Sequence, residues 1–341
     1  MYRENNHLNS HLKIWMLVLL AMIILIILVG GLTRLTDSGL SITTWELFAG
    51  LFPPLTNEKW IDYFNLYKNI PEYKEQNFNM NLNEFKIIFW WEWAHRQLGR
   101  LIGLTVLFPM IYFTFKNGLW IMKKYGLIFF LICLQGFFGW YMVSSGLIDR
   151  IDVSHYRLSI HLLTAFIILS LVFWKFLQLT NVKVNIVNFN LNIVKFFLFL
   201  LFLQLVIGAF VSGMDAGKIY NTWPLMGSSF FPDDSKLNEL LSTSVFENQS
   251  LVQFIHRNLA YLIVIFYVYL CIITLKQNCR ILYKPIIIIG ISLFIQIILG
   301  IMTILSGVKI LYASLHQINS IFIILSTLYF LYSTKYRGKI I

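Results

Sequence analysis

Four of the seven histidines in the sequence lie where metal ligands inside a membrane are expected. Each of them sits in a long apolar segment, near the end that we place on the outer side of the membrane: His95, His161, His256 and His316. An ionisable side chain in a membrane-spanning segment costs on the order of a few kcal/mol and commonly marks a functional site. A single one could equally be a helix–helix hydrogen-bond partner. Two matched pairs instead predict sites built from side chains on facing helices.

Two neutral imidazole nitrogens are the ligand set that haem iron takes at its axial positions. A bare Zn²⁺ ion needs more protein ligands than a histidine pair supplies. Each pair is therefore predicted to hold one haem. Arg96 and Arg257 directly follow a histidine and could bind haem propionates. An arginine that extends to the lipid headgroups fits the same positions.

The two histidine pairs differ in their charged neighbours. The first pair has ionisable residues where the second has neutral ones: Glu92 against Gln253, Arg100 against Tyr261, and Arg157 against Tyr312. Glu92 stands three residues before His95, so both can share one helix face. A carboxylate there could transfer protons or stabilise a developing positive charge, or it could simply pair with Arg96 or Arg157. The asymmetry predicts chemistry at the first pair, with Arg100 and Arg157 as further candidates for propionate contacts, and a permanent cofactor at the second.

The apolar segments around these residues are predicted to span a membrane. The chain is 58% hydrophobic and 13% charged, with a mean hydropathy of +0.70, which is too little charge for a soluble globular domain. A helix of roughly 20 apolar residues crosses about 30 Å of hydrocarbon and satisfies its own backbone groups there. The segments of this kind are 14–32, 93–115, 125–145, 155–177, 191–212, 253–275, 284–305 and 311–333. The predicted fold is an all-α polytopic membrane protein with eight transmembrane helices.

The net charge of +11 reflects membrane topology rather than nucleic-acid binding. The termini and alternate connections (116–124, 175–195 and 276–284) hold fourteen Lys/Arg and one acidic residue, Glu4. This bias places both termini in the cytoplasm and the long loops 33–92 and 213–252 outside. The first apolar stretch is too long for a signal peptide, and the tail before it is too short for a typical mitochondrial transit peptide. A bacterial inner membrane is therefore favoured over the mitochondrial inner membrane.

The chain is predicted to consist of two parallel four-helix repeats, 1–182 and 183–341. Polar and glycine positions recur in order at offsets of 178 and then 161 residues. The matches are Gly30 with Gly208, Asp37 with Asp215, His95-Arg96 with His256-Arg257, Gln135 with Gln296, and Gly139 with Gly300. His161 pairs with His316 at an offset of 155. Repeats with an even number of spans enter the membrane from the same side, so the two copies are related by an axis along the membrane normal.

The remaining cysteines and histidines have no predicted role in chemistry. Cys133 and Cys271 lie in spans and Cys279 in a cytoplasmic turn, so no disulfide is available in the outer loops. His155, at the outer end of the fourth span, is predicted to be a hydrated residue at the membrane surface.

Several motifs run through the chain in order. They are Gly-Gly-Leu-Thr-Arg-Leu-Thr-x-Ser-Gly-Leu-Ser at 30–41, Phe-Pro-Pro-Leu at 52–55, Trp60, Pro-Glu-Tyr at 71–73, Trp-Glu-Trp-Ala-His-Arg at 91–96 and Gln-Phe-Ile-His-Arg at 253–257. Together they resemble the haem A synthase family, over residues 14 to 333. Some members carry cysteine pairs in the outer loops. This chain has none there and is similar to the cysteine-free form found in proteobacteria and mitochondria.

The resemblance implies an oxidoreductase that converts haem O to haem A by oxidising the C8 methyl group to a formyl group, for use in haem-copper cytochrome oxidases. It implies that His95 and His161 bracket the substrate haem and that Glu92 is the catalytic carboxylate. It further implies that His256 and His316, beside Arg257, hold a haem b cofactor. An electron donor is also implied. Docking onto haem O synthase, favoured by the poor solubility of haem O, and a homo-oligomer are left open.

Two other functions fit parts of the sequence. A dihaem b-type electron-transfer subunit that oxidises quinol would explain four histidines and eight spans, but it does not explain why Glu92 and Arg100 lack counterparts in the second half. A transporter with histidine proton relays would need polar groups toward both membrane faces, whereas the histidines and acidic residues cluster toward one face. The product of the reaction distinguishes the first alternative, and the colour of the purified protein the second.

Overall fold

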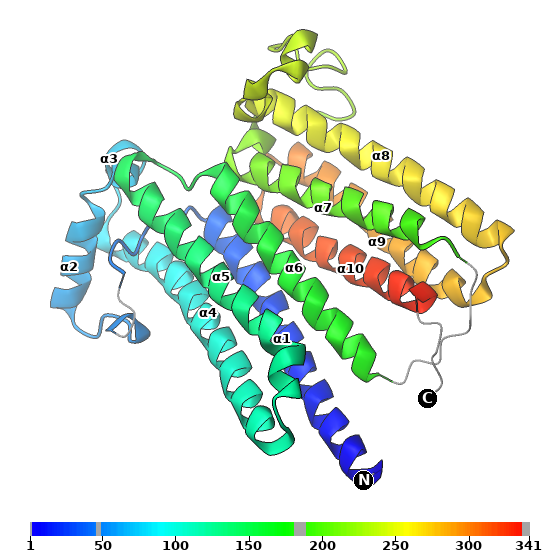
Figure 1. The fold of residues 1–341 in the computed structure, drawn as a ribbon. Helices are drawn as coiled ribbons and strands as arrows, with labels where there is room; N and C mark the ends of the chain where they lie inside the picture. The colour runs from blue at the N-terminus through cyan, green and yellow to red at the C-terminus, as the bar shows by residue number, and fades with distance from the viewer. Residues whose placement is uncertain (1, 46–48, 181–188, 336–341) are drawn as a thin grey trace. The chain divides into compact units, whose positions relative to one another are not determined.

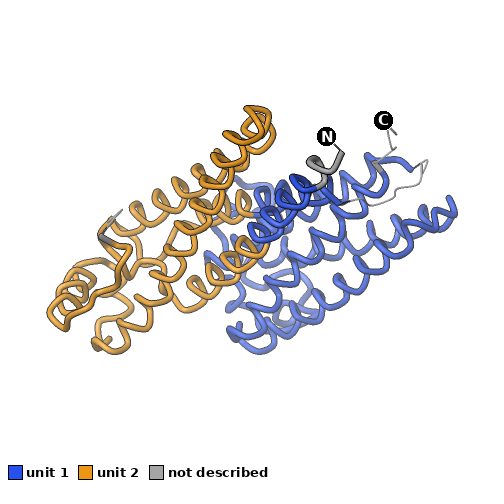
Figure 2. Tube along the Cα trace, turned by 90° about the horizontal axis from the view of Figure 1, so that it is seen from below, with its two compact units in different colours: residues 1–20, 166–341 blue, residues 21–165 orange. Residues whose placement is uncertain are grey.

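The computed structural model describes residues 2–45, 49–180 and 189–335, and these residues form helices and turns. Contacts between the residues divide the chain into two compact units, one of residues 21–165 and one of residues 1–20 with 166–341 (Figure 2). The predicted boundary between residues 182 and 183 lies outside the described residues.

Among the described residues, eight helices are long and apolar enough to cross a membrane, with mean hydropathies between 1.3 and 3.0. Figure 1 shows how these helices follow one another along the chain. They are α1 (Tyr2–Leu35), α4 (Leu82–Asn117), α5 (Trp120–Asp149), α6 (His155–Leu179), α7 (Leu191–Gly213), α8 (Gln249–Lys276), α9 (Tyr283–Leu305) and α10 (Ile310–Lys335). The prediction of an all-α protein with eight spans is confirmed, and the chain is a multi-pass membrane protein.

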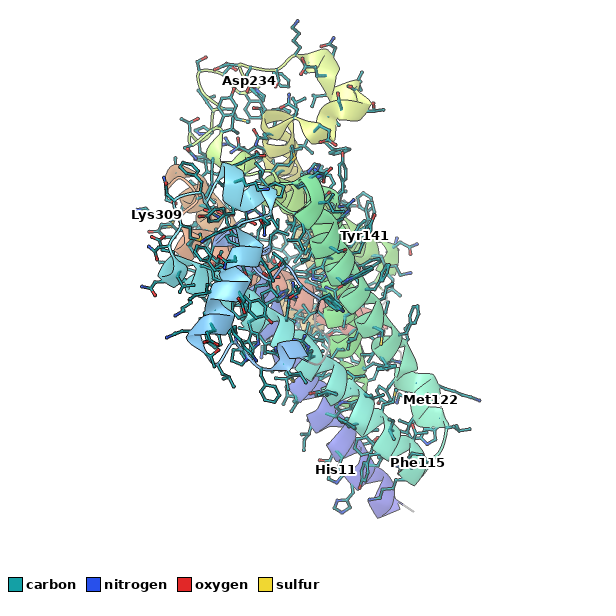
Figure 3. The ribbon with its side chains drawn as sticks, turned by 90° about the vertical axis from the view of Figure 1, so that its left-hand side faces the viewer. His11, Phe115, Met122, Tyr141, Asp234 and Lys309 are labelled. Carbon is teal, nitrogen blue, oxygen red and sulfur yellow. The ribbon has the colours of Figure 1, made fainter. Side chains whose placement is uncertain are left out.

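In the unit of residues 21–165, α4 and α5 lie side by side and antiparallel, joined at Gly118. Phe115 and Met122 therefore lie at the opposite end of this helix pair from Tyr141 (Figure 3). Gly118 has a φ of 98°, a conformation that residues with a Cβ atom rarely adopt, so glycine suits this tight connection. The unit also contains the second half of α1 and the start of α6.

α4 begins eleven residues before the predicted span at residue 93, because its first three turns pack on other outer segments. Asn81 and Glu84 form a capping box that starts the helix. The connection before it contains η1 (Ala49–Leu51), α2 (Asn57–Tyr67) and α3 (Pro71–Glu75), and α2 packs against α4. Side chains from α2, α4 and their neighbouring segments form a buried apolar group, called here the outer cluster: Leu40, Ile42, Trp60, Phe64, Tyr67, Ile70, Phe85, Ile88, Phe89 and Val153.

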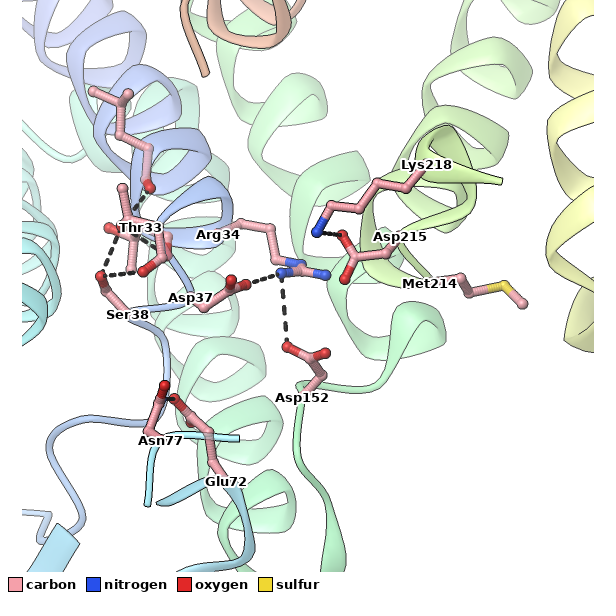
Figure 4. A network of polar contacts seen from close by, with 12 residues as sticks. Thr33, Arg34, Asp37, Ser38, Glu72, Asn77, Asp152, Met214, Asp215 and Lys218 are labelled. Carbon is pink, nitrogen blue, oxygen red and sulfur yellow. Dashed lines mark hydrogen bonds and ion pairs between the residues drawn. The ribbon is translucent and has the colours of Figure 1, made fainter. Parts of the chain in front are cut away.

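Ion pairs hold the C-terminal end of α1 in the same unit. Arg34 Nη1 lies 2.7 Å from Asp37 Oδ1 and 3.6 Å from Asp152 Oδ1, which belongs to the connection between α5 and α6 (Figure 4). Asp37 adopts a left-handed backbone conformation, with a φ of 48°, at the turn that follows α1. Asp215, its counterpart after α7, has a φ of 53°. The segments after α1 and α7 therefore both turn through a left-handed residue as they leave the helix.

In the unit of residues 1–20 and 166–341, α10 packs against α9 and α7, and α8 packs against α7. The segment between α7 and α8 contains η2 (Ala216–Lys218), η3 (Leu237–Leu241) and η4 (Thr243–Glu247), and η5 (Arg280–Leu282) precedes α9. Asn248 caps α8 by accepting hydrogen bonds from the backbone N–H groups of Ser250 and Leu251. This cap sets where α8 begins and hence the depth of its histidine.

Candidate functional site

The structure brings together the two histidine pairs that the sequence predicts. His95 on α4 faces His161 on α6, with ring centroids 6.4 Å apart and ring planes at 82°. His256 on α8 faces His316 on α10, at 6.5 Å and 67°. Two imidazoles that bind one metal from opposite sides have centroids about 6 Å apart, given metal–nitrogen bonds of about 2 Å. Both pairs thus have the spacing of axial haem ligands.

The nitrogen atoms of these rings also fit a ligand role. His316 Nδ1 lies 3.1 Å from the backbone oxygen of Gln296. Donation of Nδ1–H to a carbonyl fixes the tautomer that leaves the Nε2 lone pair for a metal. Nδ1 of His161 and Nδ1 of His256 are buried without a hydrogen-bond partner among the described residues. Over the same residues there is no group of three or more His, Cys, Asp or Glu side chains that could hold a bare metal ion.

Glutamine side chains contact three of the four histidines. Gln135 on α5 donates to the backbone oxygen of His161 at 3.0 Å. Gln204 on α7 donates to the backbone oxygen of His256 at 3.1 Å and lies 3.3 Å from its Nε2. Gln296 on α9 lies 3.2 Å from Nε2 of His316. Its own side-chain oxygen accepts from Asn319, at 2.8 Å. The sequence comparison of the two halves matched Gln135 with Gln296 but did not identify these contacts.

Glu92 is buried beside the first pair and accepts hydrogen bonds from three groups. Its side chain accepts from Ser41 Oγ at 2.7 Å, from the backbone N–H of Ile42 at 2.8 Å and from Arg96 at 2.6 Å. Arg96 in turn donates to the backbone oxygens of Ile42 (2.9 Å) and Thr44 (3.4 Å). The Glu92–Arg96 pair that the sequence allowed is therefore present, and it fastens the segment after α1 to α4.

In the unit of residues 1–20 and 166–341, the arginine at the matching position, Arg257, holds the segment after α7 without a carboxylate. Arg257 donates to the backbone oxygens of Tyr220 and Thr222, both at 3.0 Å. These residues stand 178 positions after the two carbonyls that Arg96 binds. Gln253 donates to the oxygen of Tyr220 at 3.0 Å, where Glu92 accepts from an N–H. The segment after α1 is thus held to α4 by an ion pair, and the segment after α7 is held to α8 by an arginine and an amide.

The remaining candidate arginines belong to the unit of residues 21–165. Arg100 Nη1 lies 3.4 Å from the backbone oxygen of Gly50. Arg157 donates to Ser145 Oγ, and its guanidinium carbon lies 4.8 Å from the ring centroid of Tyr141. Neither pairs with Glu92 among the described residues, so the alternative Glu92–Arg157 pair is not formed. Propionate binding by Arg96, Arg100, Arg157 and Arg257 remains a prediction.

His155 differs from its prediction. It is only 7% exposed, and its ring packs on Tyr156 with centroids 4.2 Å apart. The prediction of a hydrated surface residue is wrong, because the His155 side chain is buried. Ser41 was missed as a partner of Glu92, because 51 residues separate them and no local pattern links them.

A second carboxyl, Glu72 on α3, is buried outside the membrane spans next to the outer cluster. Tyr67 Oη donates to Glu72 Oε1 at 2.9 Å, and Asn77 Nδ2 donates to Tyr67 Oη at 2.8 Å. Glu72 is 3% exposed. Asn77 Nδ2 also donates to Glu72 Oε1 at 3.4 Å (Figure 4). Burial raises the pKa of Glu72 to about 8, and the charge of Glu92 adds to the rise, while the bond from Tyr67 lowers it. This carboxyl therefore titrates close to neutral pH.

Comparison with known proteins gives consistent matches over almost the whole chain. Residues 13–328 match the protein family described as cytochrome oxidase assembly protein. The chain is 49% identical to a heme A synthase of Pelagibacter ubique over 341 aligned positions, covering 98% of this chain and 100% of the relative. It is 42% identical to a heme A synthase of Maricaulis maris (92% of both chains) and 40% identical to one of Rickettsia bellii (96% and 98%).

Proposed function

Since the chain belongs to the haem A synthase family and is thus an enzyme of haem A synthesis, we propose that it oxidises the C8 methyl group of haem O to a formyl group. The product would supply haem-copper cytochrome oxidases, in keeping with the description of the matched family. The substrate is a membrane-soluble porphyrin, and eight apolar spans suit a multi-pass enzyme of the bacterial inner membrane.

The observation that carries this proposal is that only one of two similar histidine pairs has a buried carboxylate beside it. His95 and His161 would hold haem O as substrate in the half formed by residues 1–182. His256 and His316 would hold haem b in the half formed by residues 183–341. Conversion of a methyl to a formyl group is a four-electron oxidation, and haem b, when bound, would carry electrons one at a time between this site and a redox partner outside the chain.

Glu92 would be the residue that handles protons during the oxidation. The methyl carbon loses hydrogen and gains oxygen, so protons must leave the reacting group. A carboxylate held in place by three hydrogen-bond donors, from Ser41, Ile42 and Arg96, can accept a proton or stabilise positive charge that develops nearby. The same hydrogen bonds tie the segment after α1 to α4.

The test is haem analysis of wild type and Glu92→Gln, each expressed with a source of haem O. Extracted haems would be separated by chromatography and identified by mass and pyridine spectrum. Wild type should yield haem A. The variant should accumulate haem O or a hydroxylated intermediate, with haem A reduced about 100-fold or more, the usual contribution of a proton-transfer group. Glu75→Gln, the same change at an exposed carboxyl of α3, should behave as wild type.

Two results would contradict the proposal. Wild type that holds only haem b and never alters haem O would be an electron carrier of the dihaem type. A Glu92→Gln variant that forms haem A at the wild-type rate would leave Glu92 with a structural role alone, as the residue that holds the segment after α1 to α4.

A further inference from the structure

Each of the four histidine rings lies against a glycine of the preceding span. A Cβ atom added to any of these glycines would stand 3.0 or 3.1 Å from the imidazole, closer than ordinary van der Waals contact. The pairs are Gly30 with His95, Gly139 with His161, Gly208 with His256 and Gly300 with His316. Only the absence of a side chain lets the rings approach so closely.

Other glycines of these helices have different neighbours, and Gly290 on α9 lies against Tyr267 rather than a histidine. Gly103 on α4 and Gly136 on α5 would meet nothing within 4 Å. A similar approach at Gly146 involves the flexible side chain of Leu40, whereas an imidazole is rigid and planar. The glycines that contact histidines therefore limit where each ring can lie.

In three of the four spans, a glutamine precedes the glycine by one helical turn and contacts the same histidine. Residues four apart lie on one helix face, so amide and glycine contact the histidine together. The resulting Gln-x-x-x-Gly sites are Gln135 with Gly139, Gln204 with Gly208, and Gln296 with Gly300. The remaining case is α1, the span before His95, which has Ile26 where the amide is expected, four residues before Gly30. His95 is thus the only one of the four without an amide contact from the preceding span.

We propose that Gln-x-x-x-Gly is a two-point clamp for haem-ligating histidines, and that its interruption at Ile26 makes His95 the exchangeable ligand through which substrate haem enters and product haem leaves. This inference rests on the proposed haem O and haem b sites. A resident cofactor needs two firmly held ligands. Gln204 holds His256 through its backbone oxygen, and the carbonyl of Gln296 holds Nδ1 of His316, and both contacts can persist when Nε2 binds a metal. A substrate must be bound and released, so one of its two ligands must let go. The sequence places the unclamped histidine in the half that carries Glu92.

The ring of His95 also has a different orientation. It directs Nε2 toward its glycine at 3.0 Å, whereas the other three direct Cε1. A half-turn of the imidazole exchanges these two atoms. The amides of Gln204 and Gln296 lie against Nε2 of His256 and His316 and favour one of the two orientations, because an amide can donate to a nitrogen and not to a carbon. These two amides must move aside when Nε2 binds iron, and Gln135 holds His161 through its backbone oxygen alone. With Ile26 in that place, neither orientation of His95 is fixed by the preceding span.

The experiment measures how fast each haem leaves the purified holoprotein for an excess of apomyoglobin, with the haem types separated by chromatography. In wild type, haem A or O should leave at least tenfold faster than haem b. Ile26→Gln completes the clamp and should slow the release of haem A or O about fivefold, the value of one added hydrogen bond, without changing haem b. Leu25→Gln adds the same amide at an exposed neighbouring position and should match wild type.

A reciprocal variant tests the same idea in the second unit. Gln204→Met keeps the length of the side chain but removes its donor, and should speed the release of haem b about fivefold while leaving haem A or O unchanged. Equal release rates for both haems in wild type, or an Ile26→Gln protein that releases haem A or O as fast as Leu25→Gln, would overturn the proposal. If Ile26→Gln does not accumulate, unchanged haem b release from Gln204→Met overturns it alone. Wild type without any haem A or O would instead contradict the proposed function.

Discussion

Replacing Glu72 by glutamine should remove a pH dependence from the stability of the outer segment, residues 49–81. Glu72 is buried there, and burial raises its pKa from 4.5 to about 8. Between these two pH values the folded segment keeps a proton that the unfolded segment has lost. The contribution of Glu72 to the stability of the segment therefore falls as pH rises from 4.5 to about 8, and this contribution is constant on either side of the window.

The size of the effect follows from the pKa shift. Each pKa unit corresponds to about 1.4 kcal/mol, so the shift of Glu72 gives a loss on the order of 5 kcal/mol across the window. Glutamine cannot ionise, and its side-chain oxygen can still accept the hydrogen bond from Tyr67. At pH 8 the Glu72→Gln segment should therefore be more stable than the wild-type segment by a few kcal/mol. At pH 5 the two should differ by about 1 kcal/mol or less.

Hydrogen exchange read by mass spectrometry on peptides from residues 49–81 would measure this difference, after correction for the intrinsic dependence of exchange on pH. Glu75→Gln, an exposed carboxyl in the same helix, is the control and should follow wild type. The reasoning is refuted if Glu72→Gln loses protection between pH 5 and pH 8 as steeply as wild type does. Such a result would mean that the carboxyl of Glu72 is hydrated or paired when it ionises.

Three further changes have expected outcomes. Gly139→Ala should displace the ring of His161 and reduce the low-spin bis-histidine haem signal in electron paramagnetic resonance, whereas Gly136→Ala on the same helix, which meets nothing within 4 Å, should not. Arg257→Lys keeps the charge but not the planar set of donors, and should speed hydrogen exchange in residues 220–225 about tenfold, as expected for the loss of about 1 to 1.5 kcal/mol of hydrogen bonding; unchanged exchange would mean that the carbonyls of Tyr220 and Thr222 are held by other groups. Trp60→Ala should destabilise the outer cluster by about 3 to 5 kcal/mol and expose residues 56–81 to proteolysis, and a protease-resistant variant would contradict this role.

The spans and the histidine pairs could be predicted because lipid imposes strict rules on sequence. A segment such as 191–212 must be helical and apolar throughout, and a histidine within such a segment must have a compensating role. The register of the two halves then follows from the polar residues that recur in order. These signals are local, or depend on one offset, so one sequence contains them.

The contacts around Glu92 could not be predicted in the same way. Ser41 and Ile42 bind this carboxylate across a 50-residue connection, and only the folded path of that connection brings them together. The outer cluster is similar, because Trp60 and Phe89 pack through tertiary contacts that leave no periodic pattern. His155 was misjudged for the same reason. Its position at a helix end suggested hydration, but the folded chain buries it.

The length of α4 has a mechanical consequence. Its 36 residues correspond to about 54 Å of helix, against about 30 Å of hydrocarbon, so the helix extends well beyond the membrane. Phe89 in the outer cluster and His95 lie about 9 Å apart along this helix. Pro109, where a helix bends most easily, comes only after both of them. A displacement of the outer cluster should therefore move the imidazole of His95 as well, because one straight stretch of α4 carries both.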